Sequence, residues 1–535
     1  MGGVTGFLVV APLLVAFGSA VCTLAVGSRP RLQRATSVAG GAAYAATVAA
    51  VAWLVVLATT APGGIAYQVG GHEAPYGITL VVDGLSAFML AMAAVVALYA
   101  IAVSVRFVDP RNQRTYYHPM FQLLLVGVTG AFLAGDLFNL FVWFEVLLMA
   151  SYVFVAFYGG AQQTAAAMRY LVLNVFGGVC MLLAVGGLYA TLGTLNMAEM
   201  AVRLSDPPAG VRVAPLVGFS ALLFVTFALK AGLAPFQFWV PAAYRAAPMP
   251  VAAMLAGVTK KVGIYAIIRL YFTVFAGAQV SVRLPGIAGD SPLSALAPAL
   301  AVMSAASIVV GGLGAVSRDS LEELLAYSSI SQVGFILAPV AIAAATTAPD
   351  LRHLAVLAAL VYALHHALTK GLLFLSAAVV RDVAGTTRLS EIGGLGERSP
   401  LFSGVFFVGG LSLVGIPPLV GFFGKLLVFD AAAGRLARAP TAWSVLAVLV
   451  LLLGALLTVV YVTRAWVEGF WGVQTEPVST GRVDRPLVAL LATLATVVVL
   501  VGVGFEPVYR FADAAAAAAL DTDAYVETVL GGADG

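Results

Sequence analysis

The residues of this sequence best suited to carry chemistry are its lysines, because all of them fall inside apolar stretches. Of 28 basic residues only five are lysines, whereas most of the arginines lie between the apolar stretches. The lysines are Lys230, Lys260, Lys261, Lys370 and Lys425. Arginine keeps its proton in a protein, while a buried lysine can lose its proton readily. Lysines in such surroundings are therefore expected to bind and release protons.

The free-energy cost of these charges supports the same interpretation. A lysine at the centre of a membrane helix costs roughly 2.5–3.5 kcal/mol. Five such lysines would cost about as much as the whole free energy of unfolding of a typical domain. The amines must therefore be paired, hydrated or neutral part of the time. Snorkelling to the membrane surface is an alternative that suits Lys260 but not the other four. Structural ion pairs are a second alternative, and we interpret the lysines as proton carriers.

Acidic and histidine side chains could exchange protons with these lysines. Glu145 lies in the apolar middle of GDLFNLFVWFEVLLMASYVF, and a lysine about 6 Å away would gain roughly 2.8 kcal/mol at an effective dielectric near 20. Asp136, at the start of that stretch, is expected to be a charge at a helix N-terminus. His366 and Lys370 are spaced i, i+4, which places them on one helix face and predicts a relay. His365 points elsewhere and is expected to be a core histidine bonded to a hydroxyl or a carbonyl.

Two apolar stretches contain residues that interrupt a helix. In LKAGLAPFQFWVP, Pro235 lacks the N–H group that the carbonyl of Ala231 would need. In SLVGIPPLVGFFGKLLVF, the interruption comes from Gly415, Pro417 and Pro418. A lone proline is more often a packing kink, but broken membrane helices occur where they line buried or hydrated cavities. Two breaks, each close to a lysine, favour an ion or proton path.

Composition sets the class of protein. Among 535 residues, 61% are hydrophobic and 10% are charged, compared with about 25% charged in soluble domains. Repeated apolar runs of 18 or more residues predict an all-α polytopic membrane protein. We expect fourteen spans, centred near residues 15, 48, 95, 128, 148, 181, 225, 261, 305, 334, 366, 416, 454 and 496.

Charge and cysteine content exclude several other functions. The net charge of +3 gives no reason to expect nucleic-acid binding. Cys22 and Cys180 stand alone in apolar runs, so no disulfide, zinc or iron–sulfur site is expected. A haem would need a histidine facing His366 from another span, and none is present. We therefore expect no cofactor and no metal.

The arginines predict the orientation in the membrane. Fifteen lie in one set of alternate loops and seven in the other set. Because cytoplasmic loops are enriched in basic residues, both termini are expected outside the cell membrane of a prokaryote. The tail from residue 509 is expected to be a short surface helix or disordered.

Several motifs together resemble a known family. They are GDLFNLFVWFEVLLMASY, LKAGLAPFQFWVPAAYRAAPMPVAAMLAGVTKKVGIYAIIR, LLAYSSISQVGF, HHALTKGLLF and GIPPLVGFFGKLL. The sequence resembles the proton-translocating subunits shared by respiratory complex I, membrane-bound hydrogenases and Mrp-type cation/proton antiporters. The likeness runs from about the third span to the thirteenth, and within the family it is most like the D-type subunits of Mrp-type Na⁺/H⁺ antiporters.

The resemblance implies a fold of fourteen helices with two inverted five-helix repeats and broken helices 7 and 12. The implied divisions are helices 1–3 (1–110), the first repeat (119–275), the second repeat (294–472), helix 14 (484–508) and a short tail (509–535).

The resemblance also implies roles for single residues. Glu145 would be the acid of the fifth span and Lys230 its partner on the broken seventh span. The further proton-carrying residues would be Lys261, His366, Lys370 and Lys425. The sequence departs from the family pattern at Glu322 and Glu323, where a basic pair is usual, and this puts a cytoplasmic proton inlet there in doubt. It departs again at Phe236–Phe238, where Gln237 is the only polar residue.

Three functions remain open at this point. The main hypothesis is a non-enzymatic subunit of a multisubunit cation/proton antiporter that exchanges Na⁺ for H⁺ with partner subunits. The second is a proton-pumping subunit of an NADH dehydrogenase or hydrogenase complex, driven by redox chemistry in its partners. The third is a solitary solute permease, which would need polar residues around Pro235 and Pro417, where the sequence is mostly apolar.

Overall fold

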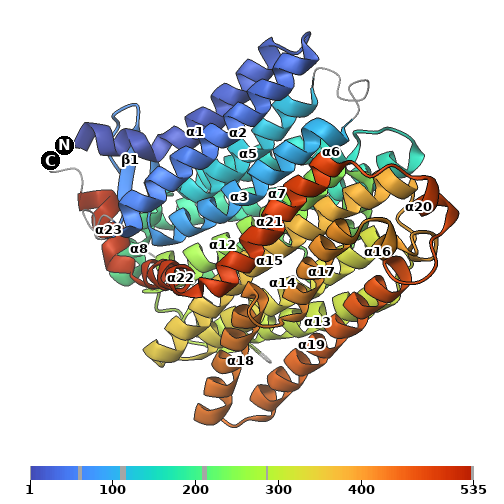
Figure 1. The fold of residues 1–535 in the computed structure, drawn as a ribbon. Coiled ribbons are helices and arrows are strands. Elements are labelled where there is room, and N and C mark those ends of the chain that lie inside the picture. Colours follow the sequence, from blue (N-terminus) through green and yellow to red (C-terminus); the bar gives the residue numbers. More distant parts are fainter. Residues whose placement is uncertain (1, 58–62, 109–115, 208–213, 285–286, 532–535) are drawn as a thin grey trace.

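The computed structural model describes residues 2–57, 63–108, 116–207, 214–284 and 287–531 (Figure 1). Most of these residues are helical, and long helices lie side by side across the molecule. The predicted all-α membrane class is confirmed. Arg111, Arg114 and Arg212, which contributed to the predicted orientation, lie outside the described residues.

Within the described ranges, eleven helical segments are long and apolar enough to cross a membrane. They are α1 (Gly2–Ala25), α2 (Pro30–Ala52) continuing into η1 (Trp53–Leu57), α3 (Gly84–Phe107), α6 (Leu137–Val155), α7 (Ala161–Leu192), the segment Met249–Val274, α13 (Pro292–Val316), α14 (Leu321–Ala345), α15 (Pro349–Ala384), α19 (Ala442–Gly469) and α21 (Arg485–Val503). Three shorter apolar helices are α5 (Tyr117–Leu133), α9 (Leu216–Ala231) and α17 (Pro400–Val414). Thirteen of the expected centres fall in these segments, and residue 416 falls just after α17. The number of membrane crossings remains a prediction.

The segment Met249–Val274 is one helical run with two π-helical stretches. It comprises α11 (Met249–Met254), η2 (Leu255–Thr259), α12 (Lys260–Ile268) and η3 (Arg269–Val274). A π-helical turn carries one extra residue and leaves backbone carbonyls displaced from their usual partners. The first such turn ends directly before the Lys260–Lys261 pair.

The helices that carry most of the lysines form the interior of the bundle. The apolar 18-residue stretch of Met249–Val274 is fully buried, and the corresponding stretches of α14 and α15 are 89% and 94% buried. The corresponding stretch of α19 is only 22% buried. Lysines on the interior helices therefore cannot reach water by extending along the protein surface.

The first expected helix break is present. α9 ends at Ala231, and Gly232 follows with φ of +67°, a left-handed conformation that favours glycine. The chain becomes helical again at α10 (Trp239–Ala246). Because Pro235 lies between the two helices and lacks an N–H group, α9 cannot continue through it. Lys230 therefore stands in the last turn of a helix that ends inside the protein.

The second expected break is also present. α17 ends at Val414, and Gly415 follows with φ of +91°. Pro417 and Pro418 come next, and α18 (Val420–Arg438) begins two residues after them. The N–H groups of Gly415 and Ile416 donate to the carbonyls of Leu411 and Ser412, whereas no helical N–H group follows for the carbonyl of Val414.

The remaining elements are short. They are α8 (Met197–Ser205), α16 (Leu395–Arg398), α20 (Glu476–Thr480), η4 (Leu389–Glu391) and two antiparallel strand pairs, β1 (Ile65–Val69) with β2 (Ile78–Val82) and β3 (Val282–Leu284) with β4 (Ile287–Gly289).

The C-terminal segment differs from its expectation. It forms α22 (Phe505–Leu520) and α23 (Thr522–Leu530), and α22 packs against α3 and α15 (Figure 1). The buried side of these helices consists of Ala512, Ala515, Ala516, Ala519, Tyr525 and Val529. The expectation of a short surface helix or a disordered tail is therefore wrong for residues 509–531, because alanines spaced three and four apart make an apolar stripe.

Candidate functional site

All five lysines are buried. Lys230, Lys260, Lys261, Lys370 and Lys425 have exposed fractions of 6, 0, 0, 0 and 7%. They come from α9, α12, α15 and α18, so the fold brings together amines that lie almost 200 residues apart in the chain. The amines thus lie inside the protein, as the distribution of lysines in the sequence predicts.

A direct contact between Lys261 and His366 lies at the centre of the site. Nζ of Lys261 is 2.5 Å from Nδ1 of His366, which joins α12 to α15. The same amine donates a hydrogen bond of 2.7 Å to the carbonyl of Ala256 in the π-helical stretch η2. The other ring nitrogen of His366 is 3.5 Å from the hydroxyl of Ser329 on α14. An amine and an imidazole at this distance can share or transfer a proton.

Lys370 lies one turn after His366 on α15 and faces the same neighbouring helix. Its amine donates to the carbonyl of Leu325, at 3.1 Å, and to the hydroxyl of Ser328, both on α14. The expected shared helix face is therefore confirmed. Ser328 and Ser329 are consecutive residues, so α14 presents adjacent hydroxyl groups to the Lys370 amine and the His366 ring.

Glu145 lies on α6, and Lys230 lies in the last turn of α9, at the first helix break. Nζ of Lys230 and Oε1 of Glu145 are buried and have no hydrogen-bond partner within the described chain. Nζ of Lys230 is 5.9 Å from the centre of the ring of Phe144, the residue next to Glu145 in the chain. No ion pair within 4.0 Å joins the two residues in the described structure.

Gly178 on α7 makes room for the Glu145 carboxylate. A Cβ atom added at Gly178 would lie 2.8 Å from Oε1 of Glu145, which is closer than real Cβ contacts. The glycine therefore allows the carboxylate to lie against the backbone of α7. Nothing in the sequence pattern alone pointed to this role.

Lys425 lies at the other break. Its amine donates a hydrogen bond of 2.6 Å to the carbonyl of Val414, and it lies 5.8 Å from the centre of the Phe335 ring. A Cβ atom at Gly415 would come within 2.9 Å of the Lys425 side chain. Gly415 thus supplies both the left-handed turn and the space for the lysine.

His365 lies between α15 and α17. Its Nδ1 atom is 3.2 Å from the hydroxyl of Thr369 and 3.5 Å from that of Ser412. The expected hydroxyl partner is therefore present. Nε2 of the same ring is buried and has no partner in the described chain, so His365 is only half satisfied.

Lys260 contradicts the snorkelling expectation. It is fully buried, and its Nζ atom has no hydrogen-bond partner in the described part of the protein. The amine lies 5.3 Å from the centre of the Tyr244 ring. The expectation is wrong because the helix that carries Lys260 is enclosed on every side, so the side chain has no path to the surface.

A buried ion pair was missed by the sequence interpretation. Arg269 and Asp83 are 2.6 Å apart, and both side chains are 1% exposed. Asp83 also caps α3 by accepting from the backbone of Ser86 at 2.9 Å. The signal was an arginine inside the apolar run GIYAIIRLYF, which neither set of loops accounted for.

The acidic residues at the start of α14 have arginine partners. Glu322 lies 2.5 Å from Arg381, and Glu323 lies 2.6 Å from Arg245. At the place where the family usually has a basic pair, Glu322 and Glu323 therefore lie beside arginines that the sequence predicts on the cytoplasmic side.

Asp136 caps a helix as expected. It precedes α6 and accepts a hydrogen bond of 2.7 Å from the backbone N–H of Asn139. Burial raises the pKa of Asp136 above its usual range, while the bonds from Asn139 oppose this shift. A structural cap is sufficient to explain the residue.

This chain is similar to known proteins over most of its length. The family described as NADH:quinone oxidoreductase/Mrp antiporter, TM matches residues 134–458. The D-type subunit of the Na⁺/H⁺ antiporter of Alkalihalophilus pseudofirmus is 34% identical over 466 residues, which cover 86% of this chain and 88% of that protein. The corresponding D-type antiporter protein of Bacillus subtilis is 32% identical over 524 residues, which cover 98% of this chain and 99% of that protein.

Relatives with a different name are also present. The N-type subunit of an NADH-quinone oxidoreductase from Desulforudis audaxviator is 35% identical over 458 residues, covering 82% of this chain and 83% of that protein. Among solved structures, a chain of the Mrp complex from a Dietzia species superimposes with a TM-score of 0.84 at 27% identity, covering 99% of this chain and all of that one. The region that the family matches contains all five buried lysines. This chain belongs to the NADH:quinone oxidoreductase/Mrp antiporter family of membrane proteins.

Proposed function

We propose that this chain is the proton-translocating, D-type subunit of a multisubunit Na⁺/H⁺ antiporter. The observation that carries the proposal is the contact between Lys261 and His366, with further buried amines toward both broken helices. Groups that can be both charged and neutral are needed at each step of such a path. The similarity to two D-type antiporter proteins over most of their length supports the same assignment.

In this proposal protons move along the row of buried groups. Glu145 and Lys230 control one end, where withdrawal of the carboxylate releases the proton of the lysine. Lys261 and His366 transfer protons in the middle, Lys370 receives them along the serines of α14, and Lys425 passes them to an exit or to a neighbouring subunit. The chain acts as a transporter component rather than as an enzyme.

We further propose the division into repeats and the orientation expected from the sequence. The two five-helix repeats are 119–275 and 294–472, flanked by helices 1–3 (1–110), helix 14 (484–508) and the tail (509–535). The two interruptions, at Pro235 and at Pro417, occupy corresponding places in the two repeats. Both termini lie outside the cell membrane, and other antiporter subunits carry or complete the Na⁺ path.

A second candidate function is a proton-pumping subunit of a redox-driven complex. The similarity to an N-type NADH-quinone oxidoreductase protein favours it. In that case partner subunits perform electron transfer, and the buried row is driven by their chemistry. The two functions differ in the energy source, since antiport needs only an Na⁺ or H⁺ gradient.

Exchange in everted membrane vesicles tests the main proposal. Lys230→Ala and Glu145→Ala should each abolish Na⁺-dependent collapse of a pH gradient while the complex still assembles on a native gel. Undiminished exchange in both variants would remove the assignment. Exchange that requires NADH and stops with a redox inhibitor would instead support the second function.

A further inference from the structure

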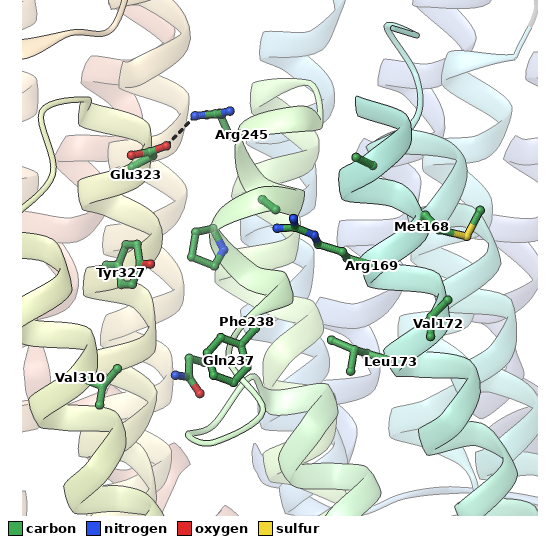
Figure 2. Close-up of a pocket in the computed structure, with 13 residues that line it drawn as sticks. Met168, Arg169, Val172, Leu173, Gln237, Phe238, Arg245, Val310, Glu323 and Tyr327 are labelled. Atoms are coloured by element: carbon green, nitrogen blue, oxygen red, sulfur yellow. Dashed lines mark hydrogen bonds and ion pairs between the residues drawn. The ribbon is translucent and has the colours of Figure 1, made fainter. Parts of the chain in front are cut away.

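We propose that a groove on the side of the bundle, beside the first helix break, is a binding site for one anionic phospholipid. The groove has a volume of about 1020 Å³ and lies between α7, the break with α10, α13 and α14 (Figure 2). Pockets for small ligands have volumes of roughly 300–1,000 Å³, so the groove is large enough for a headgroup and part of an acyl chain.

The mouth of the groove is positively charged. Arg169 reaches into the groove from α7, and Arg245 lines the groove from α10, where it is aimed at Glu323 on α14 (Figure 2). Arg245 pairs with Glu323 at 2.6 Å, whereas Arg169 has no hydrogen-bond or ion-pair partner within the described chain. One net positive charge therefore remains for a ligand, and basic pockets between membrane helices favour anionic lipid headgroups.

The part of the groove beyond the arginines is apolar. Val172 and Leu173 lie one turn after Arg169 on α7, and Phe238 and Val310 face them from the break and from α13 (Figure 2). Arg245 stands in the last turn of α10 and Glu323 in the first turn of α14. The Arg245–Glu323 pair thus lies at helix ends and Arg169 lies about two turns into α7. The apolar side chains lie farther along the same helices, which is the order of headgroup and acyl chain in a bilayer.

The groove is continuous with a surface that a bilayer would cover. Phe238 is 70% exposed and Val172 is 56% exposed. The outward face of α7 carries further exposed apolar side chains, namely Met168, Val175, Phe176, Val179, Leu182 and Leu183. An apolar face of this extent is typical of contact with lipid or with another membrane helix. The free charge of Arg169 favours the lipid, because a partner helix would have to bury that charge.

A buried polar group at the floor also lacks a partner. Gln237 is 8% exposed, it points into the groove, and its Oε1 atom has no hydrogen-bond partner in the described chain (Figure 2). A water molecule held under the lipid, or a hydroxyl group of the lipid headgroup, would donate the hydrogen bond that this oxygen lacks. Because Gln237 lies in the break that follows Lys230, the occupant of the groove would also contact the segment that joins α9 to α10.

Native mass spectrometry of the purified, assembled complex tests the proposal, with vesicles of phosphatidylcholine containing phosphatidylglycerol or cardiolipin as the lipid source. The unmodified complex should retain one anionic lipid that Arg169→Gln retains roughly tenfold less well, since a charge-assisted bond is lost. Val172→Trp, which fills the apolar part at an exposed position, should have the same effect. Arg482→Gln, a matched change of an exposed arginine outside the groove, should leave retention unchanged.

Equal retention of the anionic lipid in the complex with Arg169→Gln or Val172→Trp would overturn the proposal. Efficient cross-linking of a Val172→Cys variant to a partner subunit would overturn it as well, because a protein helix would then occupy the groove. Both readouts are independent of Na⁺/H⁺ exchange, so they remain valid if the proposed antiport function fails.

Discussion

Nζ of Lys425 donates a hydrogen bond of 2.6 Å to the carbonyl oxygen of Val414, the last residue of α17. That carbonyl is available because the helix stops there, and a helix C-terminus favours a positive charge. A broken helix therefore stabilises the protonated amine without a carboxylate. An amine held by a neutral acceptor can give up its proton without leaving an unpaired negative charge behind.

Lys425→Arg is expected to lower the exchange rate by about a hundredfold or more, the scale of a lost acid–base group. A guanidinium group can still bond to the Val414 carbonyl, but it cannot release its proton. Exchange should be measured in everted vesicles with equal amounts of assembled complex. A Lys425→Arg complex that exchanged ions at the parental rate would show that proton release at this position is not needed.

The sequence was sufficient for the broken helices and for the buried amines other than that of Lys260. Glycine and proline act through the local backbone, so Gly232, Pro235 and Gly415 can be interpreted without knowing their neighbours. The preference for lysine inside apolar stretches is likewise a property of composition. Contacts across the bundle depend on helix rotation, and the contact of Lys261 with His366 was not predicted from the sequence.

Lys261 and His366 should behave as one functional unit. Lys261→Met and His366→Gln are each expected to reduce exchange strongly, and the double variant should be no slower than the worse single variant. Residues that act together in one transfer step are not additive. A double-mutant cycle on exchange rates measures this directly, with Lys261→Met combined with Lys425→Gln as the comparison pair. Fully additive losses for Lys261 and His366 would argue against direct transfer between them.

Gly178→Ala should impair exchange, although none of the proposed proton-carrying residues lies on its helix, α7. The added Cβ would lie 2.8 Å from Oε1 of Glu145, so the carboxylate must move or lose its place against α7. Alanine is otherwise the better helix former by roughly 0.5–1 kcal/mol, so assembly should not suffer. Gly186→Ala on the same helix, with nothing within 4 Å of its added Cβ, should keep the parental rate. Equal rates in the two variants would show that the position of the Glu145 carboxylate is unimportant.

The residues that sequence interpretation missed share one physical cause. Lys260 looked able to reach the surface because helix position alone does not reveal which helices are enclosed. Arg269 was overlooked because its partner, Asp83, comes 186 residues earlier in the chain, and no local pattern connects them. The packed face of the C-terminal helices was missed because alanine-rich segments look the same whether they are buried or exposed.

The Arg269–Asp83 pair should stabilise the fold without taking part in proton movement. Asp83→Asn keeps a side chain that can cap α3 but leaves the buried arginine unpaired, which should cost roughly 3–5 kcal/mol and lower the unfolding temperature of the purified complex. Adding Arg269→Met removes the unpaired charge and should recover most of that loss. Arg203→Met, which breaks the half-exposed pair with Glu199 at 2.7 Å, should cost less than about 1 kcal/mol. If the double variant were as unstable as Asp83→Asn alone, the lost stability would come from packing around Asp83 rather than from an uncompensated charge.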